Sequence, residues 1–275
     1  MILTTINVWL DIVFTALYVV IIAFLIFHFS LFVYFGRFRK SFIEGHWPEH
    51  ESRPPALPKV LHFVHMTSMI ILGFTGMYLR FPFFPDGRTF MRGTHYVFMS
   101  IVIVTVIWRV LYAFFSRTNA DWREFAIGKK DVQSALGVLA YYGYFSNHKP
   151  HVAKYNVLQK MSYNLFLVMM AAQALTGLCL VRYGFLFGVS PSQLLLGWWT
   201  GGLGGMALAM WVVRTIHYVI NWAFIIMMTI HLYLAATVDV PCALDFFGLT
   251  ELQVKEGAHG HDDAPAAAPE LQPTN

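Results

Sequence analysis

The feature that most constrains this chain is a series of five apolar stretches, each long enough to cross a lipid bilayer. A transmembrane helix needs about 20 mainly apolar residues. The expected spans are residues 9–35, 58–79, 94–115, 157–181 and 212–236. Only 12% of the residues are charged, against about 25% in soluble domains. The sequence therefore predicts an all-α integral membrane protein.

The expected spans divide the chain into regions. Residues 1–40 contain the first span, and residues 58–245 contain the other four. The shorter apolar stretch 194–210 is broken by glycine pairs, so we expect a loop, a short interfacial helix or a lead-in to the last span. Residues 256–275 are rich in Ala, Pro, Asp and His, which predicts a disordered tail.

Positive charge predicts the orientation in the membrane. The loops after the first and third expected spans carry more Lys and Arg than the other loops, and such loops are usually cytoplasmic. We therefore expect the N-terminus outside and the C-terminus in the cytoplasm. The net charge of +4 comes without a soluble basic domain, so we expect a lipid bilayer and no nucleic acid as a partner.

The sequence gives little sign of metal or disulfide chemistry outside the spans. There are two cysteines, Cys179 and Cys242, which predicts neither a disulfide framework nor a cysteine metal site. In the tail, His259 and His261 allow either a weak metal site or a solvated segment. We favour the solvated segment.

The last expected span contains two histidines, His217 and His231, fourteen residues apart. They share one helix face, and a rise of ~1.5 Å per residue separates them by about 21 Å. Ionisable residues inside a membrane are expensive and indicate function. One metal cannot bind both rings at that distance, whereas two centres can each use one. A haem iron with two axial histidines is the natural candidate.

The partner histidines should lie at matching depths on other helices. His62 lies just past the cytoplasmic start of its span and is level with His231, whereas His95 lies near the outer end of its span and is level with His217. The predicted pairs are therefore His62–His231, called the inner pair, and His95–His217, called the outer pair. These names follow the expected orientation.

Two further histidines keep several interpretations. His65 lies one turn from His62, and it either hydrogen-bonds a propionate or a quinone or replaces His62 as the ligand, with His62 favoured. His28, in the first span, is a buried hydrogen-bonding residue, a proton-relay group or a ligand.

Glycines and arginines lie on the same helix faces. Gly73 and Gly76 follow His62 at helical spacing, and we expect them beside the outer haem because glycine permits close approach of a flat ring. Arg109 falls at the inner level and Arg214 at the outer level. Each arginine either binds haem propionates or snorkels to the membrane surface, and we leave both readings open.

These residues resemble the membrane cytochrome b subunits of nickel–iron hydrogenases, formate dehydrogenases and thiosulfate reductases. In that family one span opens with Arg-x-x-His-Trp and contains Thr-Gly about fourteen residues later. Here Lys59-Val-Leu-His62-Phe63 leads to Thr75-Gly76. The next span of the family has a histidine near its outer end, and the last has two histidines fourteen apart. The resemblance covers residues 58–245.

The resemblance implies a four-helix di-haem cytochrome b core in a bacterial cytoplasmic membrane. It implies two haem b groups, with His62, His95, His217 and His231 as ligands to the irons. It also implies an electron-transfer subunit that works with an iron–sulfur subunit and a catalytic subunit, so that another chain handles the primary substrate. Menaquinone or ubiquinone would exchange electrons on the cytoplasmic side.

A polar cluster at the start of the fourth span suits a quinone. Quinone carbonyls need hydrogen-bond donors near a haem, and the cluster offers Asn156, Gln159, Lys160 and Tyr163. The family carries a similar Tyr-Asn-x-x-Gln-Lys motif and uses that region for quinone. The alternative is ordinary helix capping and snorkelling.

Two other functions remain open from the sequence. One is a free-standing di-haem oxidoreductase that links a small donor to quinone. The other is a proton-coupled transporter whose histidines form a relay. A stoichiometric iron–sulfur partner and a b-type absorption spectrum are the observations that distinguish them.

Overall fold

The computed structural model describes residues 2–50, 52–118, 120–147, 155–184, 188–198 and 204–254. Five of its helices are long and apolar enough to cross a membrane, which confirms the five expected spans. They are α1 (Ile2–Tyr34), α2 (Ala56–Arg80), α3 (Arg88–Phe115), α6 (Val157–Cys179) and α8 (Met206–Val238). Among the described residues there is no strand, and His50 and Val254 form an isolated bridge. The predicted tail with His259 and His261 lies outside the described residues.

Short helices join the long ones. They are a π-helical turn η1 (Arg39–Ile43), α4 (Trp122–Phe125), α5 (Lys129–Tyr142), α7 (Pro191–Leu196) and α9 (Val240–Phe246). In the stretch 194–210, expected as a loop, interfacial helix or lead-in, residues 194–196 end α7 and residues 206–210 begin α8, whereas residues 199–203 lie outside the described residues. Ser190 caps α7 by accepting from the backbone of Gln193, with Pro191 in the first helical position, where its missing N–H is no loss.

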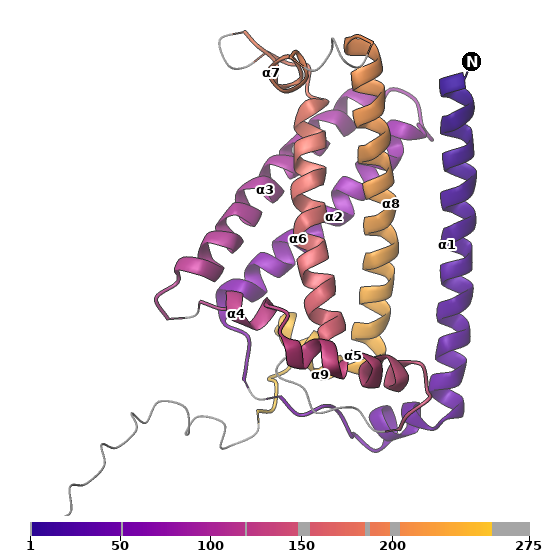
Figure 1. Ribbon diagram of the computed structural model, residues 1–275, viewed down its shortest axis with the longest axis vertical. Helices are drawn as coiled ribbons and strands as arrows, with labels where there is room; N and C mark the ends of the chain where they lie inside the picture. The colour runs from indigo at the N-terminus through magenta and orange to yellow at the C-terminus, as the bar shows by residue number, and fades with distance from the viewer. Residues whose placement is uncertain are drawn as a thin grey trace, which may run out of the picture.

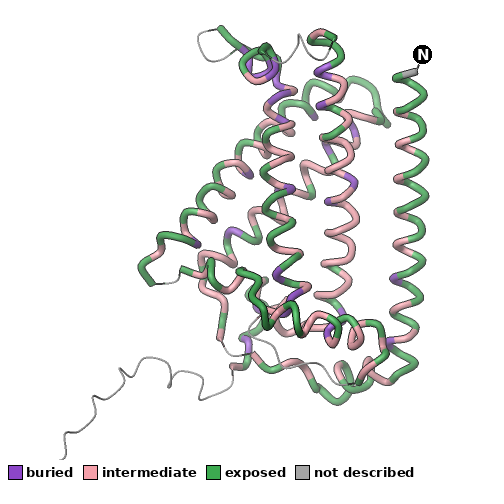
Figure 2. The backbone as a smooth tube through the Cα atoms, in the orientation of Figure 1, coloured by how far each residue is buried: buried purple, intermediate pink, exposed green. Residues whose placement is uncertain are grey.

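The long helices pack as two pairs. α2 lies along α3, and α6 lies along α8, with further contacts between α3 and α6 (Figure 1). Exposed residues line the outward faces of the bundle (Figure 2), and many of these are large and apolar, such as Val104, Trp108 and Val168. A continuous apolar exterior around satisfied helical backbones is what a bilayer requires.

α1 stands beside α8 and is attached to the bundle by polar contacts (Figure 1). The Asp11 carboxylate accepts from Arg80 at 2.8 Å and from the Tyr218 hydroxyl at 2.6 Å. Further along, the His28 ring bonds the Tyr233 hydroxyl at 2.6 Å. Partners that tie ionisable groups together are the usual condition for their presence inside a membrane.

Candidate functional site

The outer pair brings together one ring from α3 and one from α8. The centroids of the His95 and His217 rings are 6.4 Å apart, and their planes are 65° from parallel. Both side chains are half-buried. The matching depths of His95 and His217 in their spans therefore predicted that these two rings face each other.

Two threonines determine which nitrogen of each outer ring carries hydrogen. Thr75 on α2 donates its hydroxyl hydrogen to the Ile71 carbonyl at 2.7 Å and lies 2.8 Å from His95 Nδ1. A hydroxyl has one hydrogen, so Thr75 accepts from His95 Nδ1–H. The lone pair of that ring is therefore on Nε2, which is the nitrogen left to bind a metal.

The same arrangement occurs on the other helix pair. Thr176 on α6 donates to the Ala172 carbonyl at 2.8 Å and lies 2.9 Å from His217 Nδ1. The Gln173 amide nitrogen lies 3.2 Å from His217 Nε2, where it donates to the lone pair. Two independent partners thus indicate one tautomer for His217, and a metal at Nε2 would replace the amide hydrogen bond.

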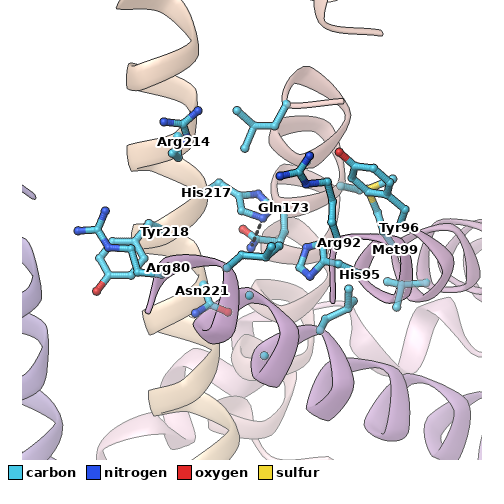
Figure 3. A pocket seen from close by; sticks show the side chains of 18 of the residues that line it. Arg80, Arg92, His95, Tyr96, Met99, Gln173, Arg214, His217, Tyr218 and Asn221 are labelled. Carbon is cyan, nitrogen blue, oxygen red and sulfur yellow. Dashed lines mark hydrogen bonds between the residues drawn. The ribbon is translucent and has the colours of Figure 1, made fainter. Parts of the chain in front are cut away.

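A large cavity surrounds the outer pair (Figure 3). Its volume is about 780 Å³, within the range of small-molecule and cofactor sites. Gln173 points into it, and its amide oxygen is buried with no hydrogen-bond partner in the described part of the chain. Such an acceptor is free to bond a group held in the cavity.

Five arginines line this cavity: Arg80, Arg88, Arg92, Arg182 and Arg214. Arg80 is already paired with Asp11. Within the described residues the other four make no ion pair with an acidic side chain. Four unpaired guanidinium groups at one end of a cavity suit an anionic ligand. Arg214, predicted to bind propionates, is therefore well placed, and its role stays a prediction.

Glycines bring the helix backbones close to the outer rings. A Cβ at Gly76 would lie 3.6 Å from His95 Cε1, and one at Gly177 would lie 3.4 Å from His217 Cε1 and 3.3 Å from Met99 Sδ. A Cβ at Gly73 would meet nothing within 4 Å. Both predicted glycines, Gly73 and Gly76, line the cavity, and Gly177 has the tightest surroundings of the three.

The inner pair joins α2 to α8 at the opposite end of the bundle. The ring centroids of His62 and His231 are 6.2 Å apart. The Phe246 ring lies edge-on to His62 at 5.0 Å, and the Phe166 ring lies 6.3 Å from His231. Within the described residues neither histidine ring makes a hydrogen bond, and His62 is exposed.

The separations within both pairs leave room for one metal atom. Half of each centroid separation, 6.4 or 6.2 Å, is close to the sum of one metal–nitrogen bond, about 2.0 Å, and the radius of an imidazole ring. Two neutral imidazoles are also suitable axial ligands for a haem iron. The centroid separations therefore fit one metal atom in each pair, and at the outer pair Thr75 and Thr176 leave the Nε2 lone pairs for it.

The other two membrane histidines are engaged elsewhere. His65 Nε2 lies 2.8 Å from the Thr105 hydroxyl, which itself donates to the Ile101 carbonyl. Because that hydroxyl hydrogen is already used, Thr105 accepts from His65 Nε2–H. The His65 ring is therefore directed at α3 and not at α8. Both ring nitrogens of His28 have partners, the Tyr233 hydroxyl at 2.6 Å and the Tyr142 carbonyl at 3.0 Å. A hydrogen-bonding role suits both residues best.

Arg109 does not point an unpaired charge at the inner pair. Its guanidinium forms two hydrogen bonds with the Asp121 carboxylate, at 3.1 and 2.6 Å, and it stacks near the Phe125 ring. The paired carboxylate balances its charge. The assignment of Arg109 to propionates stays a prediction that this contact does not favour.

The predicted quinone residues gather at the start of α6. Asn156 and Gln159 cap the helix by exchanging side-chain and backbone hydrogen bonds at 2.9 and 3.0 Å. Lys160 is buried and bonded to Asp131 at 3.0 Å. Capping and ion pairing thus use part of this cluster, as the alternative interpretation expected.

Three donors of that cluster remain for a ligand, one of which is the amide nitrogen of the exposed Gln159, because the cap uses only its side-chain oxygen. The Asn156 amide nitrogen has only a long contact of 3.4 Å to the Tyr142 hydroxyl. The Tyr163 hydroxyl makes no hydrogen bond within the described residues, although its ring packs against Phe125 and Tyr155. Burial raises the pKa of Tyr142, so that hydroxyl keeps its hydrogen.

Several residues of the outer site were not predicted from the sequence. Thr176, Gln173 and Gly177 lie on α6, for which only quinone contacts were predicted. A signal was present, because Thr176-Gly177 repeats the dipeptide Thr75-Gly76. Each pair sets a threonine against a histidine Nδ1 and a glycine against the same ring.

Comparison with known proteins assigns the chain to a family. No curated protein and no solved structure gives a significant match. The sequence model of the family described as prokaryotic cytochrome b561 matches residues 54–241, more than half of the chain and the whole of α2, α3, α6 and α8. This family comprises the membrane cytochromes b of hydrogenase-type complexes, whose members bind haem b and transfer electrons in the membrane. The chain belongs to the prokaryotic cytochrome b561 family.

Proposed function

We propose that this chain is the membrane-anchoring cytochrome b subunit of a larger redox complex. It carries electrons between membrane quinone and an extracytoplasmic iron–sulfur or catalytic subunit of the hydrogenase, formate dehydrogenase or thiosulfate reductase type. The observation that carries the proposal is the presence of two facing histidine pairs, 6.4 and 6.2 Å between centroids, at two levels of α8.

Each pair is proposed to hold one haem b, which supplies reversible one-electron transfer at its iron when bound. His95 and His217 offer Nε2 lone pairs, and Thr75 and Thr176 keep those lone pairs in place through Nδ1. Hydrogen bonds of this kind orient a metal ligand and raise its basicity. His62 and His231 serve the inner group without such support.

The spacing of the pairs suits transfer across a bilayer. Fourteen residues separate His217 from His231, which amounts to about 21 Å along the helix. The hydrocarbon core is about 30 Å thick. An electron carrier at either membrane surface therefore lies within a few ångströms of the depth of one pair.

The two ends of the bundle offer different chemistry to ligands. The unpaired arginines of the outer cavity provide positive charge for haem carboxylates. At the inner end, Asn156 and Tyr163 provide hydrogen-bond donors for menaquinone or ubiquinone. With the expected orientation, N-terminus outside and C-terminus inside, quinone reduction takes its protons from the cytoplasm.

Absorption spectra of the purified full-length chain test the proposed haem content. We expect reduced-minus-oxidised b-type bands and two haems per chain in a pyridine haemochrome assay. A folded chain without b-type absorption would contradict the haem assignment. One haem per chain would contradict the arrangement of two centres.

The quinone assignment has its own test. Asn156→Ser keeps an oxygen that caps α6 and removes the amide donor, so we expect slower reoxidation of the dithionite-reduced protein by a soluble quinone analogue. Asn164→Ser is the control, because Asn164 is an exposed asparagine on the same helix. Equal rates in the two variants and the unaltered protein would exclude Asn156 as a quinone contact.

The partner assignment is tested in native membranes. An affinity tag on this chain should recover a stoichiometric iron–sulfur subunit after mild solubilisation. Recovery of a haem-loaded chain with no iron–sulfur protein, under conditions that keep other complexes intact, would favour the free-standing oxidoreductase instead.

A further inference from the structure

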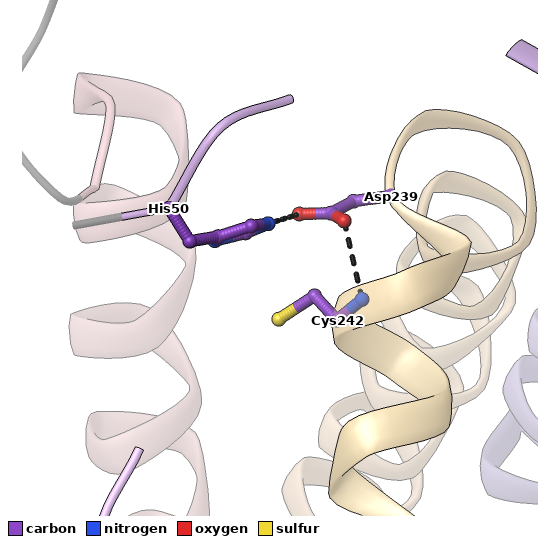
Figure 4. Close-up of side chains that lie close together, drawn as sticks. All are labelled: His50, Asp239 and Cys242. Carbon is purple, nitrogen blue, oxygen red and sulfur yellow. Dashed lines mark hydrogen bonds and ion pairs between the residues drawn. The ribbon is translucent and has the colours of Figure 1, made fainter. Parts of the chain in front are cut away.

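Three side chains that can bind metals meet at the C-terminal end of α8 (Figure 4). His50 comes from the loop after α1, Asp239 lies between α8 and α9, and Cys242 is in the first turn of α9. Their ligand atoms all lie within 4.8 Å of one another. His50 Nε2 is 3.0 Å from Asp239 Oδ2, and neither side chain is more than 24% exposed.

The surrounding backbone holds the three groups in place. Asp239 caps α9, because its Oδ1 accepts from the Cys242 backbone at 3.2 Å, and this leaves Oδ2 directed at His50. The His50 backbone pairs with Val254. Next to it, Arg53 donates to the Leu252 carbonyl at 2.9 Å. The loop and the C-terminal segment are therefore joined on both sides of the cluster.

The donor set selects one class of metal. An imidazole nitrogen, a carboxylate oxygen and a thiol sulfur are the ligands of zinc, whereas magnesium and calcium prefer oxygen alone. Bonds of about 2.0–2.3 Å around a tetrahedral zinc place its ligand atoms about 3–4 Å apart. Small rotations of these side chains bring them to such distances, with a fourth position left for water.

The local charge also suits a cation. Lys59 already pairs with Asp245 at 2.7 Å, so the negative charge of Asp239 is the one left facing the thiol and His50. A divalent cation would balance that charge and displace the thiol proton.

We propose that His50, Asp239 and Cys242 form a binding site for a zinc-class divalent cation. The bound ion joins the loop after α1 to the start of α9, beneath the inner pair. The site is independent of the haem proposal. The sequence predicted no cysteine metal site. His50 is about 190 residues from Asp239 and Cys242 along the chain, so their spacing gave no sign of a shared site.

Zinc binding to the purified full-length chain tests the proposal. After chelation and dialysis, we expect one zinc per chain to rebind, measured by elemental analysis. His50→Ala, Asp239→Asn and Cys242→Ser should each lower the affinity at least tenfold while the helix content measured by circular dichroism, which reports folding, stays the same. His46→Ala is the matched control, since His46 is an exposed histidine on the same loop, and it should leave the affinity unchanged.

Alkylation of the unaltered chain gives a second readout that no misfolded variant can obscure. Zinc should slow alkylation of Cys242 at least tenfold, with the buried Cys179 as the internal reference that zinc does not affect. Equal alkylation with and without zinc would overturn the proposal. So would loss of zinc from a His259→Ala/His261→Ala double variant, because the ion would then belong to the tail.

Discussion

The outer and inner histidine pairs have nearly the same ring separation but different surroundings. At the outer pair each ring donates from Nδ1 to a threonine hydroxyl, and the rings face a cavity of about 780 Å³. At the inner pair, within the described residues, both rings lack hydrogen bonds and are flanked by Phe246 and Phe166. One pair is held by polar contacts and the other by aromatic packing.

The difference shows that the bundle prepares its two sites to different degrees. A ligand whose tautomer and orientation are already set loses less freedom when a metal binds. We therefore expect the outer haem to be held more tightly and in a more uniform geometry. The exposed His62 leaves the inner site more open.

Replacement of the histidines should have the largest effect and tests the pairing itself. His95→Ala and His217→Ala should each remove only the outer haem, and His62→Ala and His231→Ala only the inner one. In each case haem content should fall from two per chain to one, because a single imidazole holds the iron poorly. Haem content and redox titration provide the measurement.

His65→Ala is the control for that series. Its ring is bonded to Thr105, so both haems should remain. If His65→Ala lost the inner haem and His62→Ala kept it, the inner pair would be wrong.

Removal of the threonine hydroxyls should break the asymmetry between the sites. Thr75→Val and Thr176→Val keep the side-chain shape and remove the acceptor of the Nδ1 hydrogen. Loss of such support usually lowers metal affinity about 10–100-fold, so the outer haem should dissociate faster and shift its reduction potential, while the inner haem is unaffected. Transfer of haem to an acceptor protein measures the loss.

Thr105→Val is the matched control, because Thr105 makes the same kind of contact with His65. It should change neither haem. Equal effects of all three threonine substitutions would mean that general packing, and not the ligand hydrogen bond, distinguishes the outer site.

A larger side chain at Gly177 should close the outer site selectively. A Cβ there already lies 3.3 Å from Met99 Sδ and 3.4 Å from His217 Cε1, so Gly177→Leu forces the ring or the sulfur to move. Overpacking costs about 1–3 kcal/mol, which predicts a loss of outer-haem affinity of about tenfold or more.

Gly93→Ala serves as the comparison, because Gly93 lies on α3 outside the cavity lining and its Cβ would meet nothing within 4 Å. It should retain both haems. Loss of the outer haem in Gly93→Ala would show that the site responds to any added side-chain volume, and not to the space beside His217.

The smallest effect is expected where α1 is attached at the outer end. Asp11→Asn removes the ion pair with Arg80 and should lower the free energy of unfolding by about 1 kcal/mol, with both haems retained. The exposed Asp86, in the loop on the same side, provides the control Asp86→Asn, which should have no effect. Thermal unfolding in detergent is the measurement, and a lost haem in Asp11→Asn would place α1 within the outer site.

Much of the fold and the pairing follow from local chemistry along the chain. Apolar length predicted all five spans, and the spacing of His217 and His231 with the depths of His62 and His95 predicted which rings face each other. The fourteen-residue helix α5 was missed. It lies on the surface, where packing against α6 decides whether a marginal helix forms.

Side-chain partners were beyond the reach of spacing arguments. Arg109 shares a level with the inner pair but is bonded to Asp121, and Lys160 opens α6 but is bonded to Asp131. Helical periodicity gives the depth and face of a residue, whereas a hydrogen bond depends on which neighbour arrives within about 3 Å. That neighbour comes from another part of the chain.

By itself, therefore, the sequence determined the membrane class, the number of spans and the levels of the histidines, because these depend on hydropathy and on helical rise. Tertiary structure alone decided that Thr75 and Thr176 bond the outer rings, that His65 turns to Thr105, and that His50 meets Cys242. These contacts join residues from different helices and loops, so no periodicity within one helix contains them.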